Sequence, residues 1–295
     1  MGKKGKSGNV VLLRLLMGVF ACMFVVSGFM LIRDYVQTSR QQETFDQLNG
    51  RFLQAPEPVE TVAAGGAPKE KEETGGGAAA ADTPLPLKGR IPPQQWKGWW
   101  DEAARQRFAV YRSMKEENPD MVGWIRIEGT NIDYPVMHTP DQADFYLHHD
   151  FYKKSSSYGT PYLLESCRYE EPRTSLLISG HHMKNGSMFA AIQNYTEEAY
   201  FQEHPYIQFD TMDVAGSYEI AAVIKVDASG DQSIWYELLF PQEEGGFQQA
   251  WGRVKQKRFY DTGVELGEGD ELLALVTCEY TLKDGRLMVI AKRIF

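Results

Sequence analysis

The sequence predicts a mainly β fold, a barrel or a sandwich, that follows a membrane helix and a linker. Three observations predict this organisation: one long uncharged apolar run near the N-terminus, a stretch rich in Pro, Gly and Ala after it, and then a series of short runs rich in β-branched and aromatic residues. The chain has 295 residues, of which 43% are hydrophobic, which is enough for one sizeable core. We therefore expect one folded domain.

The apolar run LLMGVFACMFVVSGFMLI, residues 15–32, is long enough to cross a bilayer. As a helix it spans about 27 Å, close to the hydrocarbon thickness. The basic residues ahead of it are Lys3, Lys4, Lys6 and Arg14. The positive-inside rule then keeps residues 1–9 in the cytoplasm and sends the rest of the chain outside. A cleavable signal peptide is the alternative, but the run exceeds a usual h-region and lacks a clear cleavage site. We predict a single-pass anchor over 10–32.

The segment after the anchor has the composition of a stalk. Residues 33–54 keep scattered apolar positions and can extend the helix outward. Residues 55–93 contain AGGAPKEKEE and GGGAAAA, which offer too little apolar surface to fold. Such a flexible linker lets a domain sweep its surroundings, and we place the folded extracellular domain at 94–295.

The folded domain opens with an amphipathic helix and continues with strands. In WKGWWDEAARQRFAVYRSMKEENPD, apolar residues recur at helical spacing: Trp100, Ala104, Phe108 and Tyr111. An Asn-Pro pair closes this helix. The strand-like runs that follow are VGWIRI, NIDYPV, TPYLLE, SLLIS, YIQFD, YEIAAVIKV, ELLALVT and RLMVIAKRI. Two segments between them, 187–204 and 241–259, are predicted to be helices packed on the sheet.

Charge and cysteine content exclude several classes of function. The net charge of −9 argues against a nucleic-acid partner, which needs a clustered basic surface. The cysteines are Cys22, Cys167 and Cys278, too few and too far apart for a disulfide framework or a zinc site with paired CxxC ligands. Cys22 lies within the apolar run, and Cys167 stands in a polar, loop-like setting as an incidental thiol. No metal or cofactor is expected.

A thiol and a guanidinium stand at the two mouths of the C-terminal hairpin. If Cys278 faces Arg286, the turn centres on Leu282 within TLKDG, whose Asp-Gly pair suits a turn. Opposed residues share a face with Cβ atoms about 5 Å apart. A nearby cation lowers the pKa of a thiol and can hold an oxyanion. The competing interpretation is a buried filler cysteine beside a solvated edge arginine.

A thiol nucleophile also needs a proton donor for the leaving group, and histidine is the usual one. His181 follows the run SLLIS and a glycine, so it emerges at the end of a strand, where sites are often placed. His181 and His182 could equally be solvated loop residues, as could His148 and His149. A metal role is disfavoured, because no HExxH motif or suitable acidic ligand accompanies them.

The ordered set of motifs resembles one known family. An anchor, a stalk, NPDMVGWIRIEGTNIDYPVMH, DFYLHHDF, ISGHHMKNGSMF, ALVTCEY and GRLMVIAKRI together are similar to the class B sortases, over roughly residues 96–295. The segment ALVTC is similar to the family signature TLxTC, with Ala274 in place of the first threonine. The resemblance implies an eight-stranded β-barrel with N-terminal helices and an extra helix before the seventh strand.

The resemblance also implies a function and a site. It implies a cysteine transpeptidase on the outer face of a Gram-positive-type membrane, which cleaves a C-terminal sorting signal of surface proteins through a thioacyl-enzyme and transfers the acyl group to a cell-wall amine. Cys278 would be the nucleophile, His181 the general acid and then base, with His182 as second choice, and Arg286 the oxyanion stabiliser. The substrate groove would fall at Leu147, Thr277 and Glu279. A surface cysteine hydrolase and an inactive tethered binding module remain as alternatives.

Overall fold

The computed structural model describes residues 5–54, 106–171, 175–212, 214–227, 232–279, 281 and 284–294. The linker expected over 55–93 lies outside the described residues, and so do Leu282 at the tip of the terminal hairpin and the first part of the helix expected from Trp96.

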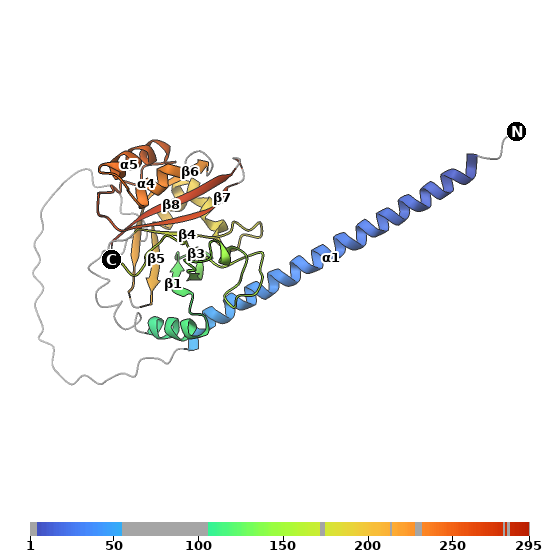
Figure 1. The fold of residues 1–295 in the computed structure, drawn as a ribbon, viewed down its shortest axis with the longest axis horizontal. Helices are drawn as coiled ribbons and strands as arrows, with labels where there is room; N and C mark the ends of the chain where they lie inside the picture. Colours follow the sequence, from blue (N-terminus) through green and yellow to red (C-terminus); the bar gives the residue numbers. More distant parts are fainter. Residues whose placement is uncertain are drawn as a thin grey trace, which may run out of the picture.

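A single long helix, α1 (Gly5–Gln54), covers both the predicted anchor and its predicted extension. Its N-terminal half runs clear of the rest of the protein, as Figure 1 shows, and the large apolar side chains there are exposed, Phe24 by 82%. Among the described residues, α1 is the one helix that is long enough and apolar enough to cross a membrane. Exposed apolar side chains over such a length are what a lipid environment requires.

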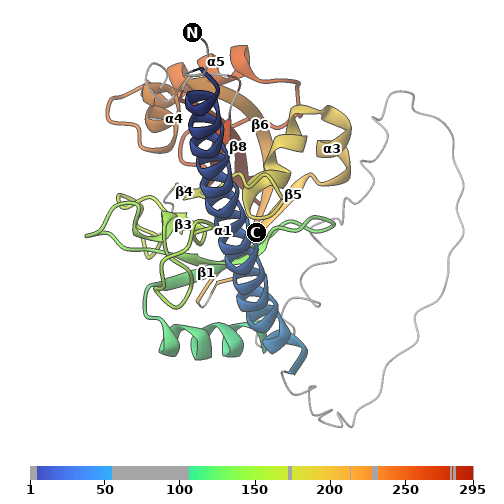
Figure 2. The ribbon, with the colours of Figure 1, turned by 90° about the vertical axis from the view of Figure 1, so that its right-hand side faces the viewer.

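Among the described residues, eight strands close into a barrel in the order β1-β2-β3-β4-β7-β8-β6-β5. Figures 1 and 2 show the barrel from two directions at right angles. The strands are β1 (Met121–Arg126), β2 (Asp133–Met137), β3 (Tyr162–Leu163), β4 (Leu176–Ser179), β5 (Tyr206–Thr211), β6 (Ser217–Asp227), β7 (Leu272–Glu279) and β8 (Gly285–Arg293). Each one coincides with a run singled out in the sequence, so the eight-stranded barrel is confirmed. Most neighbours are antiparallel, whereas β2 with β3 and β4 with β7 run parallel.

The helices before and between the strands complete the core. The described part of the first predicted helix, 106–117, is helical. Its Tyr111 is buried and donates a hydrogen bond to Asp210 at 3.0 Å, and Arg107 also donates to this carboxylate at 3.1 Å. Asn118 ends the helix, and its side chain donates to the Phe151 carbonyl at 2.6 Å. These bonds fix the helix against the barrel.

The helices before the seventh strand are α4 (Gln232–Leu239) and α5 (Gly246–Lys257). The predicted apolar stripe of α5 is buried: Phe247, Ala250, Trp251 and Val254. Helix α4 is not among the elements expected from the sequence, because it spans only eight residues.

The segment 187–204 differs from the single helix expected there. It forms the 3₁₀ helix η2 (Phe189–Thr196), which is followed, after an extended Glu197, by the short helix α3 (Glu198–Glu203). The Thr196 hydroxyl donates to the Gln193 carbonyl at 3.0 Å. Asn, Tyr and Thr in succession are weak helix formers, and a side chain that bonds the local backbone competes with helix propagation.

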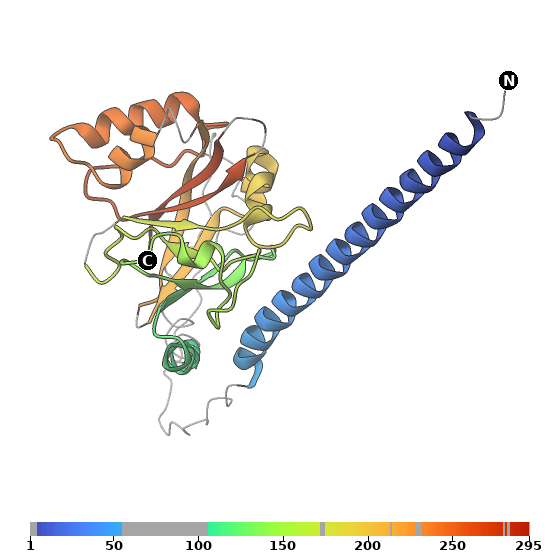
Figure 3. The ribbon, with the colours of Figure 1, turned by 45° about the vertical axis from the view of Figure 1, so that its right-hand side comes forward.

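The C-terminal part of α1 contacts the barrel, which differs from a domain free to sweep at the end of a stalk. Leu48 is fully buried and Phe45 is 6% exposed, and both belong to the hydrophobic core. Figure 3 shows this end of the helix beside helix 106–117, where Arg51 pairs with Glu117 at 2.5 Å. Direct contact therefore holds the barrel to the helix, whatever path residues 55–105 take.

Candidate active site

The parallel pairing of β4 with β7 brings the segments that carry His181 and Cys278 together. Ser179 is in register with Val276, and the Gly180 amide donates to the Val276 carbonyl at 3.1 Å. His181 lies two residues beyond Ser179, where β4 ends, and Cys278 lies two residues beyond Val276 in β7. Because the carboxyl ends of parallel strands lie at the same edge, a histidine just after one strand and a cysteine at the end of the next become neighbours.

Gly180, the residue before the histidine, is required by close packing. A Cβ atom at this position would lie 2.7 Å from the ring of Phe189. The Phe189 amide donates to the His181 carbonyl at 2.9 Å, so the loop that starts at His181 closes back on itself. A glycine is what permits that closure.

On its other side, β7 pairs with β8, and Cys278 is directly opposite Arg286. The hairpin register predicted from the sequence is therefore confirmed. Both residues are half-buried, whereas Thr277 and Leu287, the rung before them, are buried. Side chains on opposed residues share a face with Cβ atoms about 5 Å apart. The thiol and the guanidinium thus occupy adjacent positions on one accessible face.

The imidazole of His181 has a defined orientation and a shifted acidity. Its Nε2 lies 2.8 Å from the carbonyl oxygen of Leu147, in the 3₁₀ helix η1 (Phe145–Leu147). A carbonyl only accepts, so Nε2 carries a proton and Nδ1 is left to accept one. Burial lowers the pKa of His181; the bond to Leu147 opposes this, and the nearby His148 lowers it further. The neutral imidazole is favoured, which suits a base.

The guanidinium of Arg286 has few partners. It donates to the Gly285 carbonyl at 3.0 Å, and among the described residues no carboxylate forms a salt bridge with it. Most of its five N–H donors remain for a ligand. A cation left without a carboxylate beside a thiol is suited to a developing negative charge.

Two side chains that the sequence analysis did not assign to this task hold the peptide of the cysteine. His182 Nδ1 lies 3.3 Å from the Cys278 carbonyl, and Gln193 of η2 donates to the same oxygen at 3.2 Å. Strand β4 ends before this point, so the carbonyl has no ladder partner on that side. His182, the second choice as general acid, bonds the backbone here. Nothing in the local sequence marks Gln193, because its partner is 85 residues away.

The residues expected in the substrate groove are tied into the protein. Thr277 is 2% exposed, and its hydroxyl donates to the Gly180 carbonyl at 2.7 Å. Glu279 is also buried and pairs with Lys225 at 3.0 Å. Burial alone would raise the pKa of the Glu279 carboxyl, but hydrogen bonds from Lys225 and Thr281 leave it lowered. Both residues thus brace the cysteine end of β7.

Leu147 lies beside the histidine. Its side chain is only partly buried against the core, and its carbonyl is the acceptor for His181. His148 follows it, with its ring centroid 6.2 Å from that of His181. His149 instead stacks on Phe145 at 3.9 Å. Of the two loop histidines, only His148 therefore borders the candidate site.

Cys167 lies apart from this constellation. The polar setting expected for Cys167 is wrong, because its side chain is buried, with 2% exposed, and accepts a hydrogen bond from the Leu177 amide at 3.4 Å. The short turn at residues 164–167 folds the thiol inward. Burial raises the pKa of the Cys167 thiol to about 11, so it is a poor nucleophile near neutral pH. Among the described residues, no group of His, Cys, Asp or Glu could hold a metal ion.

Comparison with known proteins identifies relatives of this arrangement. The sortase domain model matches residues 125–294. The chain is 31% identical over 186 residues to sortase B of Listeria monocytogenes, covering 62% of this chain and 73% of that protein. It is 26% identical to sortase B of Staphylococcus aureus, covering 62% and 74%. The crystal structure of Clostridium perfringens sortase B superposes with a TM-score of 0.57 at 30% identity, covering 62% of this chain and 99% of that one.

Proposed function

Since the chain belongs to the sortase family, as a cysteine transpeptidase of the sortase B type, we propose that it cleaves a C-terminal sorting signal of surface proteins and transfers the acyl group to a cell-wall amine. The observation that supports this most directly is the strand pairing around β7: Cys278 is opposite Arg286 on β8, and His181 follows two residues after the end of β4, the other neighbour of β7.

In the first step the sulfur of Cys278 attacks the scissile carbonyl carbon. The thiol proton passes to the neutral imidazole of His181, whose lowered pKa keeps it ready to accept. The carbonyl electron pair moves onto oxygen and produces a tetrahedral oxyanion. The guanidinium of Arg286 stabilises this charge, since it is adjacent to Cys278 and lacks a carboxylate partner in the described part of the chain.

Collapse of the oxyanion breaks the peptide C–N bond. The His181 imidazolium gives its proton to the departing amine, and the acyl group stays on Cys278 as a thioester. An incoming amine then attacks the thioester carbonyl and loses a proton to His181, and the thiol of Cys278 leaves. One peptide bond is exchanged for another, and because the thioester conserves the activation of the acyl group, the cycle needs no ATP.

The substrate class and the location are part of the same proposal. Staphylococcus aureus sortase B, which shares this fold, has been solved as a substrate complex. The exposed apolar half of α1 suits a membrane anchor, and the basic residues ahead of it favour a cytoplasmic N-terminus with the barrel outside. A barrel on the outer face would meet surface proteins as they leave the membrane.

The proposal is tested by turnover of sorting-signal peptides, screened as a library, with and without an added amine. We expect cleavage of a subset of peptides and, when the amine is present, a product in which the amine is joined to the N-terminal fragment. Cys278→Ala should abolish both, whereas Cys167→Ala should leave them nearly intact. Equal activity of the two variants would refute the site. Cleavage with no amine product under any acceptor would indicate a hydrolase, and binding without cleavage a scaffold.

A further inference from the structure

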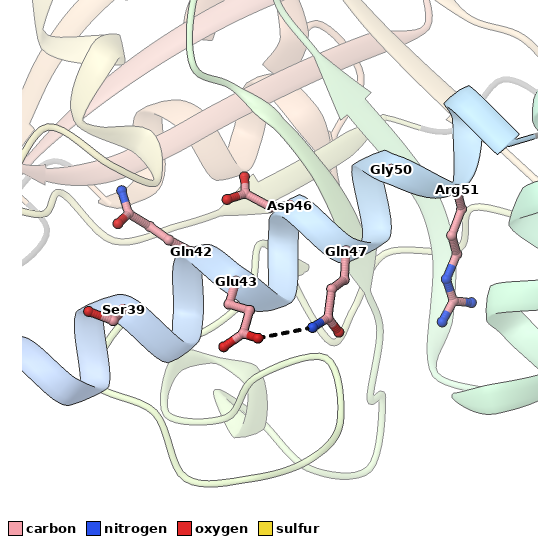
Figure 4. A pocket seen from close by; sticks show the side chains of 7 residues that line it. All are labelled: Ser39, Gln42, Glu43, Asp46, Gln47, Gly50 and Arg51. Carbon is pink, nitrogen blue, oxygen red and sulfur yellow. Dashed lines mark hydrogen bonds between the residues drawn. The ribbon is translucent and has the colours of Figure 1, made fainter.

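The part of α1 that contacts the barrel, residues 37–52, is an amphipathic helix with one protein-facing side. The buried positions are Gln41, Phe45 and Leu48, at spacings of four and three. The opposite side is polar and carries Ser39, Gln42, Glu43, Asp46 and Gln47, which Figure 4 shows; Gln47 donates to Glu43 at 3.4 Å. We call residues 37–52 the docked segment.

A buried glutamine fixes the docked segment at a specific place. Gln41 is 4% exposed, and its Nε2 donates to the Gly159 carbonyl at 3.1 Å. Its Oε1 accepts from the Ser156 hydroxyl at 2.8 Å. A buried amide with both ends bonded resists sliding or rotation of the helix, because any shift leaves polar groups unpaired. The docked segment therefore has a defined position on the barrel.

One chain of contacts leads from the docked segment to the loop that begins at His181. Thr38 forms a hydrogen bond with the hydroxyl of Tyr158. The same hydroxyl accepts from Asn185 at 3.1 Å. Asn185 in turn accepts from the amide and the hydroxyl of Ser187, at 3.1 and 2.7 Å. Tyr158, which is 4% exposed, thus connects the membrane helix with the middle of the loop.

A second chain reaches the far end of that loop. Phe45 packs on the ring of Tyr134, with centroids 4.8 Å apart. The Tyr134 hydroxyl accepts from the amide of Met188 at 3.2 Å. Met188 has a φ of 56°, a conformation that a side chain other than glycine adopts only when its surroundings enforce it. The next amide, that of Phe189, bonds the carbonyl of His181.

We infer that the docked segment is a positioning element of the active site: it holds the loop of residues 181–189 through Tyr158 and Tyr134, and so couples the orientation of His181 to the membrane helix. The inference rests on the proposed role of His181. It makes Tyr158 and Gln41 positioning residues, which touch neither the thiol nor the substrate. A barrel detached from α1 would keep its strands and lose the order of this loop.

The test measures hydrogen exchange and peptide turnover on the full chain in lipid nanodiscs. Tyr158→Phe removes only the hydroxyl that joins Thr38 to Asn185, and Gln41→Ala removes the buried amide. We expect faster exchange over residues 183–189, unchanged exchange in β7 and β8, and a fall in kcat of roughly tenfold with KM nearly constant, because the histidine is misplaced while the groove is kept. The matched controls are Tyr236→Phe, on α4, and Gln42→Ala, on the exposed side of the same helix turn.

Wild-type exchange and wild-type kcat in both Tyr158→Phe and Gln41→Ala would overturn the inference, and so would equal effects in the controls. Cys278→Ala separates this inference from the proposed function. It should show no turnover but slow exchange in the loop. If that variant stayed active, the proposed catalytic roles would fail, while the exchange data would still report whether α1 orders the loop.

Discussion

Strand β8 carries an arginine near each end, and the two have different surroundings. Arg293, at the end remote from the cysteine, pairs with Glu271 at 2.5 Å, and its neighbour Lys292 pairs with Asp270 at 2.8 Å. Arg286, opposite Cys278, bonds a backbone carbonyl, and within the described residues no carboxylate forms a salt bridge with it. The two ends of one strand thus differ in how their positive charge is compensated.

This difference shows how a fold can reserve a charge for chemistry. At the remote end, carboxylates neutralise the cations and the interactions are local to the surface. At the site end, Glu279 follows the cysteine directly, yet it pairs with Lys225 of β6 rather than with Arg286. The carboxylate nearest in sequence to the thiol, that of Glu279, is therefore paired with Lys225. The guanidinium stays available for an oxyanion.

The largest expected effect on activity is that of Arg286→Ala, and Arg293→Ala at the other end of β8 is its matched control. Arg286→Ala should lower kcat/KM by roughly a hundredfold to a thousandfold, the range for loss of an oxyanion donor. Arg293→Ala should leave kcat/KM nearly unchanged and lower the free energy of unfolding by at most about 1 kcal/mol, as for a surface ion pair. Peptide turnover and denaturant unfolding measure the two. Similar losses of activity in both variants would remove the distinction between the ends of β8.

Arg286→Lys sharpens this comparison, because it keeps the charge and removes the planar fork of donors. If charge alone stabilises the oxyanion, the lysine variant should retain most of the activity lost in Arg286→Ala. If the geometry of the donors matters, both variants should be similarly impaired. A lysine variant less active than the alanine variant would contradict a stabilising role for the positive charge.

A smaller effect is expected at the bond between the strand of the cysteine and the loop of the histidine. Thr277→Val keeps the shape of the side chain but removes the donor to the Gly180 carbonyl. The unpaired buried carbonyl should lower the free energy of unfolding by about 1 to 3 kcal/mol. We expect kcat to fall roughly tenfold with KM nearly constant, since the register of His181 and Cys278 loosens. Unchanged kcat would show that this bond does not govern the alignment.

The pH dependence should respond to His148. Its charge is one cause of the lowered pKa of His181, so His148→Asn should raise that pKa and move the acid limb of the kcat/KM profile to higher pH. The His181 pKa is lower folded than unfolded, so its contribution to stability is present above the ordinary histidine range and is lost as pH falls through the folded pKa. NMR titration of His181 measures the shift directly. A downward shift would contradict it.

The smallest effect on activity is expected at the second thiol of the folded domain. Cys167→Ala should leave turnover unchanged and cost about 1 kcal/mol of unfolding free energy, because it removes a buried sulfur atom that accepts a hydrogen bond. Iodoacetamide at pH 8 should label Cys278 and spare Cys167 in the native protein, as the raised pKa and burial require. Rapid labelling of Cys167 would show that the turn at 164–167 opens readily.

The strands and the terminal hairpin could be predicted from the sequence because their signals are local. The runs of β-branched residues mark each strand, and the spacing of Cys278 and Arg286 about TLKDG makes their pairing possible, which the structure confirms. The neighbourhood of His181 was expected from the family resemblance. Its physical cause, the parallel pairing of β4 with β7, joins segments about a hundred residues apart and leaves no local pattern.

The features that could not be predicted depend on contacts between distant segments. Gln193 bonds the Cys278 carbonyl only because η2 turns toward the end of β7. Thr277 and Glu279 bond the Gly180 carbonyl and Lys225, so their side chains stabilise the end of β7 and do not line an open groove. The docked segment of α1 was expected as a helical extension, but its spacing alone does not say which surface it meets. Burial of Gln41 is a property of the assembled fold.

The most direct test of the account is intact-mass and peptide mapping of the enzyme during turnover of a sorting-signal peptide. We predict one acyl adduct per chain, released by hydroxylamine as expected for a thioester, and located on the fragment that contains Cys278. The adduct should build up more slowly in Arg286→Ala. An adduct on Cys167 or on a hydroxyl residue, or turnover that proceeds in Cys278→Ala, would contradict the assignment of the nucleophile.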